Sequence, residues 1–177
     1  MRTITIRPAE WPRDERAIAA LDASFESDWT FAVVAGPLSF AVVERAADPP
    51  ISKRYAVPME DLRAARTVVA EEGGRVVGVA AITAEPWNRR AVLVHLYVDR
   101  PARECGVGLA LLQWARHAAR TAGARCLWAE TQDVNAPAIR FYLHHGFVWC
   151  GLDTTLYDPR EVAGETALFF AYGLEES

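Results

Sequence analysis

The 177-residue sequence has few cysteines, no long uninterrupted apolar run and no excess of positive charge. Its three cysteines (Cys105, Cys126 and Cys150) form no Cys-x-x-Cys pair, which argues against a disulfide framework and against a metal site. The longest mostly apolar stretch, residues 31–43, is interrupted by Gly36 and is too short to span a membrane. The net charge of -4 disfavours nucleic acid as a partner, because nucleic-acid-binding domains usually present a basic face.

Targeting signals and some catalytic motifs are also lacking. Residues 1–10 have no apolar core of a signal peptide, so with the reduced cysteines the sequence predicts a cytoplasmic protein without a membrane partner. No serine carries the flanking glycines of a nucleophile elbow, so a serine triad is not indicated. No repeat or low-complexity tract divides the chain, and we predict a single domain over residues 1–177.

Hydrophobic periodicity is what the sequence does show, and it predicts a mixed sheet. The predicted strands cover residues 3–7, 30–35, 38–44, 68–70, 76–81, 91–98, 125–131, 148–157 and 166–172. The predicted helices cover residues 106–121, residues 135–144 and a segment from Pro12 that includes Ile18, Leu21 and Phe25. An antiparallel meander followed by strand-helix-strand-helix-strand predicts an α/β fold (an α+β mixed sheet), with a mostly antiparallel sheet flanked by helices.

Two connections carry specific signals. Gly73-Gly74 between two valine-rich runs predicts a tight hairpin. Asp48-Pro49-Pro50 breaks regular structure, so residues 48–61 are predicted as a long surface loop, and such loops often serve as lids.

The turn at residues 103–108 reads Arg-Glu-Cys-Gly-Val-Gly and leads into a predicted helix. Glycines at a helix start expose its first N–H groups, and the helix dipole adds positive potential, which favours a phosphate-bearing ligand. A structural loop would also use such glycines. A dinucleotide-binding fingerprint with Glu130 as its acidic residue is disfavoured because Leu111 stands in place of the third glycine. A P-loop is disfavoured because no Gly-Lys-Ser/Thr follows.

Two motifs resemble the signatures of the GNAT superfamily of N-acetyltransferases. Arg103-x-x-Gly106-x-Gly108 is similar to the first signature, and residues 135–147 are similar to the second, about 30 residues further on. The matching residues of the second motif are Asn135, Pro137, Ala138, Arg140, Phe141, Tyr142, Gly146 and Phe147. The resemblance covers roughly residues 74–157 and implies the acyl-CoA N-acyltransferase fold, with direct transfer of acetyl from acetyl-CoA to an amine.

A further string resembles the streptothricin acetyltransferase branch of that superfamily. It comprises Leu-Trp-Ala-Glu-Thr-Gln-Asp-Val-Asn at residues 127–135, with residues 151–153 and 156–158. This resemblance implies an acceptor amine on the β-lysine moiety of a polycationic antibiotic, and hence antibiotic resistance. Another small amine, a polyamine or a protein amine, and a non-catalytic CoA-binding role, stay open as alternatives. Relatives are often dimers, so a homodimer is also expected.

The superfamily resemblance implies where acetyl-CoA binds. The pyrophosphate would lie on N–H groups of the turn, pantetheine would run beside the preceding strand, and the N–H near Val98 would polarise the thioester carbonyl. The predicted cofactor-binding residues are Leu96, Tyr97, Val98, Arg103, Glu104, Cys105, Gly106, Val107, Gly108, Leu109, Asn135, Ala138 and Tyr142. Glu104 and Cys105 stand where many relatives have glycine and a basic residue. A carboxylate there weakens binding if it faces the phosphates and has little effect if it points outward.

The resemblance also implies proton-transfer roles. Tyr142 is the predicted general acid for the departing thiolate, whereas Asn135 can equally be a helix N-cap. The candidates for the base are His95, Glu130, Asp133 and Asp153. The predicted substrate-binding residues are Glu130, Asp133, Asp153 and Tyr157. His95 is expected to share a strand face with Leu93 and Tyr97, which is also the setting of an ordinary core histidine.

Overall fold

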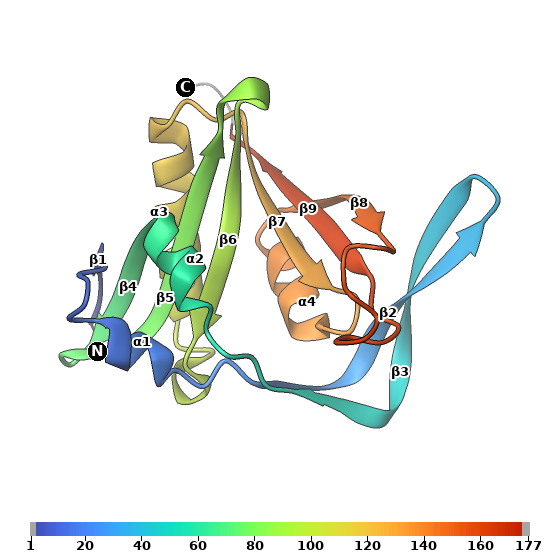
Figure 1. The fold of residues 1–177 in the computed structure, drawn as a ribbon, viewed down its shortest axis with the longest axis horizontal. Coiled ribbons are helices and arrows are strands. Elements are labelled where there is room, and N and C mark those ends of the chain that lie inside the picture. Colours follow the sequence, from blue (N-terminus) through green and yellow to red (C-terminus); the bar gives the residue numbers. More distant parts are fainter. Residues whose placement is uncertain (1–2, 175–177) are drawn as a thin grey trace. The chain divides into compact units, whose positions relative to one another are not determined.

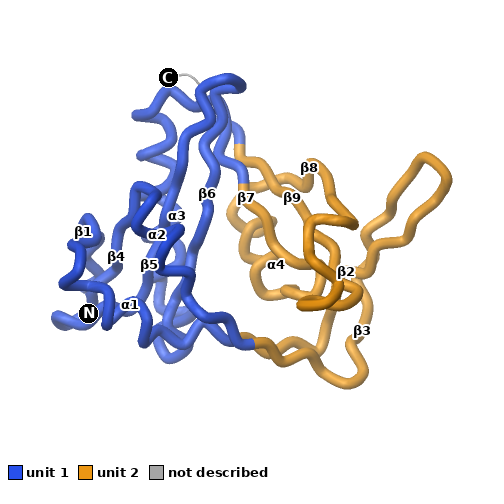
Figure 2. Tube along the Cα trace, in the orientation of Figure 1, with its two compact units in different colours: residues 1–24, 54–128, 173–177 blue, residues 25–53, 129–172 orange. Residues whose placement is uncertain are grey.

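A computed structural model describes residues 3–174 of the chain. Contacts between residues divide it into two compact units (Figure 2). Within the described residues, the first unit comprises residues 3–24, 54–128 and 173–174, and the second comprises residues 25–53 and 129–172. Each unit is therefore assembled from segments that lie far apart in the sequence.

The first unit contains an antiparallel sheet (Figure 1). Its strands are β1 (Ile4–Pro8), β4 (Arg66–Glu72), β5 (Arg75–Glu85) and β6 (Arg90–Val98), hydrogen-bonded in the order β1-β4-β5-β6. Gly73 and Gly74 join β4 to β5 with φ of 57° and 79°. Positive φ at both central residues is what a tight hairpin turn requires, so the predicted hairpin is confirmed.

Helices cover both faces of this sheet. The helices α1 (Glu15–Ala19) and α2 (Met59–Ala64) bury one face, with a core of Ile18, Leu21, Leu62, Val69, Val76, Val79 and Ala81. The helix α3 (Val107–Thr121) packs on β5 next to Gly78, whose neighbour Val79 belongs to the α1–α2 core. Because successive strand residues point to opposite faces, α3 lies on the other side of the sheet.

The second unit holds two groups of strands and one helix. The strands β7 (Cys126–Gln132, which begins in the first unit), β9 (Ala167–Gly173) and β8 (Val148–Asp153) follow in the order β7-β9-β8. The strands β2 (Phe25–Gly36) and β3 (Ser39–Lys53) form a separate antiparallel pair. The helix α4 (Ala136–His144) contacts β2 and β8. No helix among residues 3–174 is long and apolar enough to cross a membrane.

The prediction of a loop over residues 48–61 is wrong, because β3 continues to Lys53 and α2 begins at Met59. The strand tolerates Pro49 and Pro50 because the register shifts there, from Ser27 opposite Ile51 to Trp29 opposite Ala46. Residues inside such a bulge are not needed as ladder donors, so proline's missing N–H costs little.

Two predicted element ends are also wrong. The first helix ends at Ala19 and Phe25 begins β2, because Asp22 leaves the helical path: its carboxylate accepts the Ser24 N–H at 3.0 Å. The strand β8 ends at Asp153 instead of Tyr157, because the Asp153 carboxylate accepts the Thr155 N–H at 2.7 Å and turns the chain.

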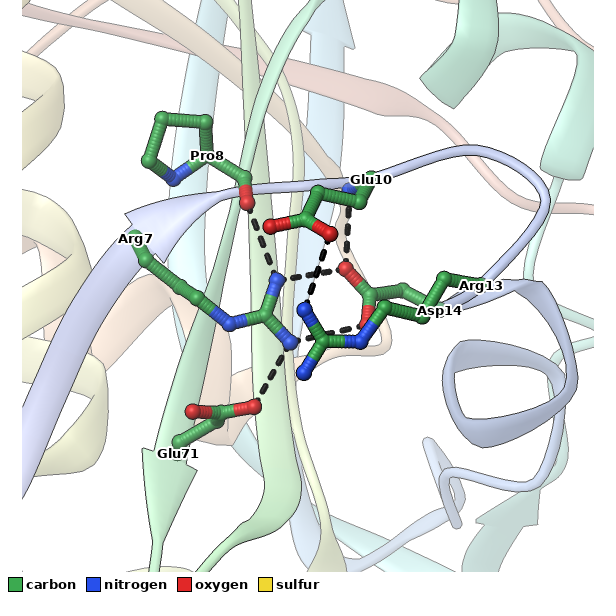
Figure 3. Close-up of polar contacts among 6 residues, drawn as sticks. All are labelled: Arg7, Pro8, Glu10, Arg13, Asp14 and Glu71. Atoms are coloured by element: carbon green, nitrogen blue, oxygen red, sulfur yellow. Dashed lines mark hydrogen bonds and ion pairs between the residues drawn. The ribbon is translucent and has the colours of Figure 1, made fainter.

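An ion network fixes the edge of the first unit's sheet (Figure 3). Arg7 on β1 donates to both carboxylate oxygens of Asp14, at 2.6 and 2.8 Å, and to Glu71 on β4 at 2.6 Å. The Asp14 carboxylate also accepts the Glu10 N–H at 2.8 Å. Hydrogen bonds from Arg7 lower the pKa of Asp14 and of Glu71. The network therefore ties β1, the start of α1 and β4 together.

Candidate active site

The turn before α3 is held in place by the side chain of Arg103. Its Nε donates to the Val98 carbonyl at the end of β6 at 3.1 Å, and one terminal nitrogen donates to the Asp22 carbonyl at 3.2 Å. Burial lowers the pKa of Arg103. The guanidinium thus bonds to the protein's own backbone and holds the turn in shape.

The start of α3 has the geometry of an anion site. The first intrahelical bond runs from the Ala110 N–H to the Gly106 carbonyl at 3.0 Å, so the N–H groups of Val107, Gly108 and Leu109 have no acceptor within the helix. Gly106 has φ of 85°, and a Cβ built on it would meet no described atom within 4 Å. The open approach and the helix dipole together favour a phosphate oxygen.

Glu104 and Cys105 are both exposed in this turn. Glu104 has φ of 61°, which lies in the left-handed region. Glycine adopts this conformation without steric strain, whereas it costs other residues about 1–2 kcal/mol of conformational energy. The departure from the superfamily pattern at this position therefore carries a backbone cost as well as an added negative charge.

A cluster of three polar side chains is formed by His95 and Tyr97 of β6 with Asp61 of α2. The His95 Nε2 lies 3.1 Å from the Asp61 carboxylate, and its Nδ1 lies 3.4 Å from the Tyr97 hydroxyl. Burial lowers the pKa of His95, although Asp61 opposes the shift. The neutral imidazole is therefore favoured, and a neutral imidazole can accept a proton.

The expectation that His95 shares a face with Leu93 is wrong. His95 pairs with Ala81 and Leu93 pairs with Ile82, with a register shift between them. Since Ala81 and Ile82 are consecutive, they point to opposite faces, and so do their partners. The bulge on β6 leaves His95 on the same face as Tyr97, whose partner is Val79.

Glu130 and Tyr157 are brought together in the second unit. The Tyr157 hydroxyl donates to a Glu130 carboxylate oxygen. Burial raises the pKa of Glu130, and the bond from Tyr157 partly offsets this. A carboxylate with a raised pKa takes up a proton more readily than an exposed one, which suits a general base.

The other two acidic candidates accept hydrogen bonds from the backbone. Asp133 is 7% exposed, and its carboxylate accepts the Thr166 N–H at 3.2 Å, while burial raises its pKa. Asp153 bonds to Thr155 within its own turn, and these bonds lower its pKa. Asp153 is therefore the weaker base, and Asp133 joins the end of β7 to the start of β9.

Asn135 caps the helix α4, where its side chain accepts the Ala138 N–H at 3.2 Å. Tyr142 on the same helix is 8% exposed, and its ring lies 5.2 Å from that of Phe147 and 5.9 Å from that of Phe170 between centroids. These contacts fix the ring, so its hydroxyl has a defined direction.

The sequence did not indicate the role of Glu165. It lines a cavity of about 430 Å³ in the second unit. The cavity is lined by Thr154, Thr155, Tyr157, Pro159, Val162, Gly164, Glu165 and Thr166. Glu165 forms an ion pair with Lys53 of β3. Among residues 3–174, no group of His, Cys, Asp and Glu side chains could hold a metal ion.

Residues 38–147 match the model of the acetyltransferase (GNAT) family. The chain therefore belongs to the GNAT acetyltransferase family, and the predicted mostly antiparallel sheet flanked by helices is confirmed. It is an N-acetyltransferase that uses acetyl-CoA as co-substrate.

Individual relatives are similar to this chain over most of its length. Streptothricin acetyltransferase of Streptomyces lavendulae is 35% identical over 170 residues, with 90% of each protein covered. The crystal structure of nourseothricin acetyltransferase superposes with a TM-score of 0.89 at 38% identity, covering 97% of this chain and 99% of that one. An acetyl coenzyme A complex of a protein provisionally named streptothricin acetyltransferase, from Bacillus anthracis str. Ames, shares the fold with a TM-score of 0.81 at 23% identity, covering 97% and 99%.

Proposed function

We propose that the protein transfers the acetyl group of acetyl-CoA to the β-lysine amine of streptothricin, and so confers resistance to antibiotics of this polycationic class. The observation that carries the proposal is the likeness to streptothricin acetyltransferase over almost the whole chain. The half-buried Glu130–Tyr157 pair, which lies in the strings that resemble this branch, supports it.

The cofactor contacts that we propose begin at α3. The N–H groups of Val107, Gly108 and Leu109 would donate to the pyrophosphate, and β6 would offer backbone groups to pantetheine. The N–H near Val98 would donate to the thioester carbonyl oxygen, on which negative charge develops. Acetyl-CoA supplies the activated acetyl group. The two superfamily motifs lie one in each unit, so we propose that the chain acts as a single N-acetyltransferase domain.

Two residues of the second unit would move the protons. Glu130, whose pKa burial raises, would accept the proton of the substrate ammonium directly or through water, with His95 as the second candidate. Tyr142 would donate a proton to the departing thiolate, since its fixed ring holds the hydroxyl in one direction.

The protein would work in the cytoplasm as a homodimer. The strands β2 and β3 form a sheet of their own, and residues 31–43 on them carry no charged side chain. A long apolar hairpin of this kind is stable when another surface covers it. A second copy offers the same apolar face, so the contact can close by two-fold symmetry.

An acetyl-transfer assay tests the proposal. Thiol release from acetyl-CoA is expected with streptothricin and not with lysine-bearing peptides, and mass spectrometry of the product should show one added acetyl group on the β-lysine. Release with peptides alone would replace the proposal by a protein acceptor. Failure to bind millimolar acetyl-CoA in calorimetry would contradict the cofactor contacts.

A further inference from the structure

The cavity of the second unit is lined by Glu165, whose carboxylate makes an ion pair through only one of its two oxygens. The side chain of Glu165 is 10% exposed, and its Oε1 pairs with the Lys53 ammonium. Its Oε2 is buried and has no hydrogen-bond partner among the described residues. A buried carboxylate oxygen without a donor is destabilising, so this atom is suited to a donor that a ligand brings.

The charges around Glu165 favour a cation. Glu165 contributes to raising the pKa of Asp133, so the two carboxylates lie within electrostatic range of each other. Tyr157, on the cavity wall, bonds to the Glu130 carboxylate. Lys53 brings an ammonium to Oε1 of Glu165, which shows the kind of donor that this carboxylate accepts. A further ammonium would offset the excess of negative charge.

The walls of the cavity fit an aliphatic chain. Pro159 and Val162 present apolar surface, whereas Thr154 and Thr155 bring hydroxyl groups. A volume of about 430 Å³ lies within the range of small-ligand pockets and exceeds what a single ammonium needs. The cavity therefore has room for methylene groups that end in a cation.

We propose that this cavity binds a second, non-reacting alkylammonium group of the acceptor, with Glu165 Oε2 as its hydrogen-bond acceptor. The inference rests on the proposed function only in requiring an acceptor with more than one cation. Glu165 is then a specificity-determining residue that separates polyamine-like acceptors from monoamines, without taking part in proton transfer.

Glu165→Gln tests this role, with Glu161→Gln as its control. Glu161 is exposed in the same loop and does not line the cavity. Its variant therefore makes the same change of charge without changing the cavity wall. We expect the KM for streptothricin to rise roughly tenfold or more in Glu165→Gln, with kcat and the acetyl-CoA Kd within twofold of wild type. Glu161→Gln should leave all three constants unchanged. A fall in kcat without a change in KM would overturn the proposal.

Direct binding keeps the test independent of turnover. Calorimetry with spermidine and with butylamine should show that only spermidine loses affinity in Glu165→Gln, by a similar factor. Lys53→Gln, which removes a neighbouring positive charge that repels the bound cation, should bind spermidine more tightly than wild type. If wild-type protein fails to acetylate streptothricin but shows this spermidine pattern, the proposed substrate fails while the cation subsite stands. Equal spermidine binding by wild type and folded Glu165→Gln would contradict the subsite.

Discussion

At the scale of single residues, the acidic side chains of the second unit differ in what surrounds them. Glu130 lies next to a tyrosine hydroxyl in a half-buried setting, whereas Asp153 bonds to Thr155 in an exposed turn. The first arrangement raises a pKa and the second lowers one. Of the two, Glu130 is the better base, although the sequence offers them as equals.

Glu130→Gln is expected to lower kcat/KM by about 100-fold or more, because the base is lost while the Tyr157 hydroxyl keeps an acceptor. In the wild type, kcat/KM should rise with pH through the pKa of Glu130, above the ordinary value of 4.5. A raised carboxylate pKa means that the folded state holds the proton more tightly than the unfolded state. This group therefore destabilises the fold increasingly as pH rises, and the variant should melt no lower than wild type at pH 7. A pH–rate profile with an unchanged acid limb in the variant would contradict the assignment.

Tyr142→Phe is expected to reduce kcat by about 100-fold while changing the acetyl-CoA Kd less than twofold, because only the proton donor is removed. Stopped-flow thiol release and calorimetry measure the two quantities. Tyr172→Phe is the matched control, since Tyr172 also packs against Phe147 in the second unit and has no proposed proton-transfer role. Equal turnover in the two variants would show that Tyr142 is not the acid.

At the scale of elements, α3 approaches the sheet closely because of Gly78 on β5. A Cβ there would lie 3.0 Å from Leu111 Cδ1, 3.0 Å from the Tyr97 carbonyl and 3.1 Å from Val107 Cγ1. Gly78→Ala should therefore destabilise the fold by about 1–3 kcal/mol and shift the start of α3. We expect a lower Tm together with an acetyl-CoA Kd raised several-fold. A Cβ built on Gly173 would meet no described atom within 4 Å, so Gly173→Ala should change neither quantity.

The network of Arg7, Asp14 and Glu71 predicts how the first unit responds to acid (Figure 3). Bonds to Arg7 depress both carboxylate pKa values below their unfolded values, so the folded state favours the ionised forms. This stability is present above the unfolded pKa values, about 4, and is lost as pH falls through the folded ones. Asp14→Asn should cost about 2 kcal/mol at pH 7 and progressively less towards pH 3, as measured by urea unfolding. A pH-independent difference would contradict the ion-pair origin.

At the scale of the whole molecule, local signals predicted the elements that local physics determines. The glycine pair at 73–74 and the helix that follows Gly106 need only backbone conformation and periodicity, and both were predicted correctly. The continuation of β3 through Pro49 depends on a bulge in its pairing with β2, and the end of α1 depends on Asp22 and on Asp99 far along the chain. Such contacts leave no pattern in the sequence.

In the candidate site, too, local sequence patterns were predicted and long-range contacts were not. The two superfamily motifs are contiguous in sequence and could be recognised, whereas the ion pair of Lys53 with Glu165 joins two distant segments. The face of His95 was misjudged because a bulge on β6 interrupts the alternation that the prediction assumed. A bulge is set by pairing with the neighbouring strand, which a single strand's sequence does not encode.

The exposed outer part of the β2–β3 hairpin gives the last prediction. Val34 and Val43 are 44% and 40% exposed, and their pairing with Ala41 and Ala32 puts both on one face. Size-exclusion chromatography with light scattering should give twice the chain mass for wild type. Val34→Lys with Val43→Lys should give the mass of one chain, because two buried ammonium groups oppose the contact. Trp87→Lys, at an 85% exposed position in the first unit, should stay dimeric. A monomeric wild type at micromolar concentration would show that the hairpin is not a dimer contact.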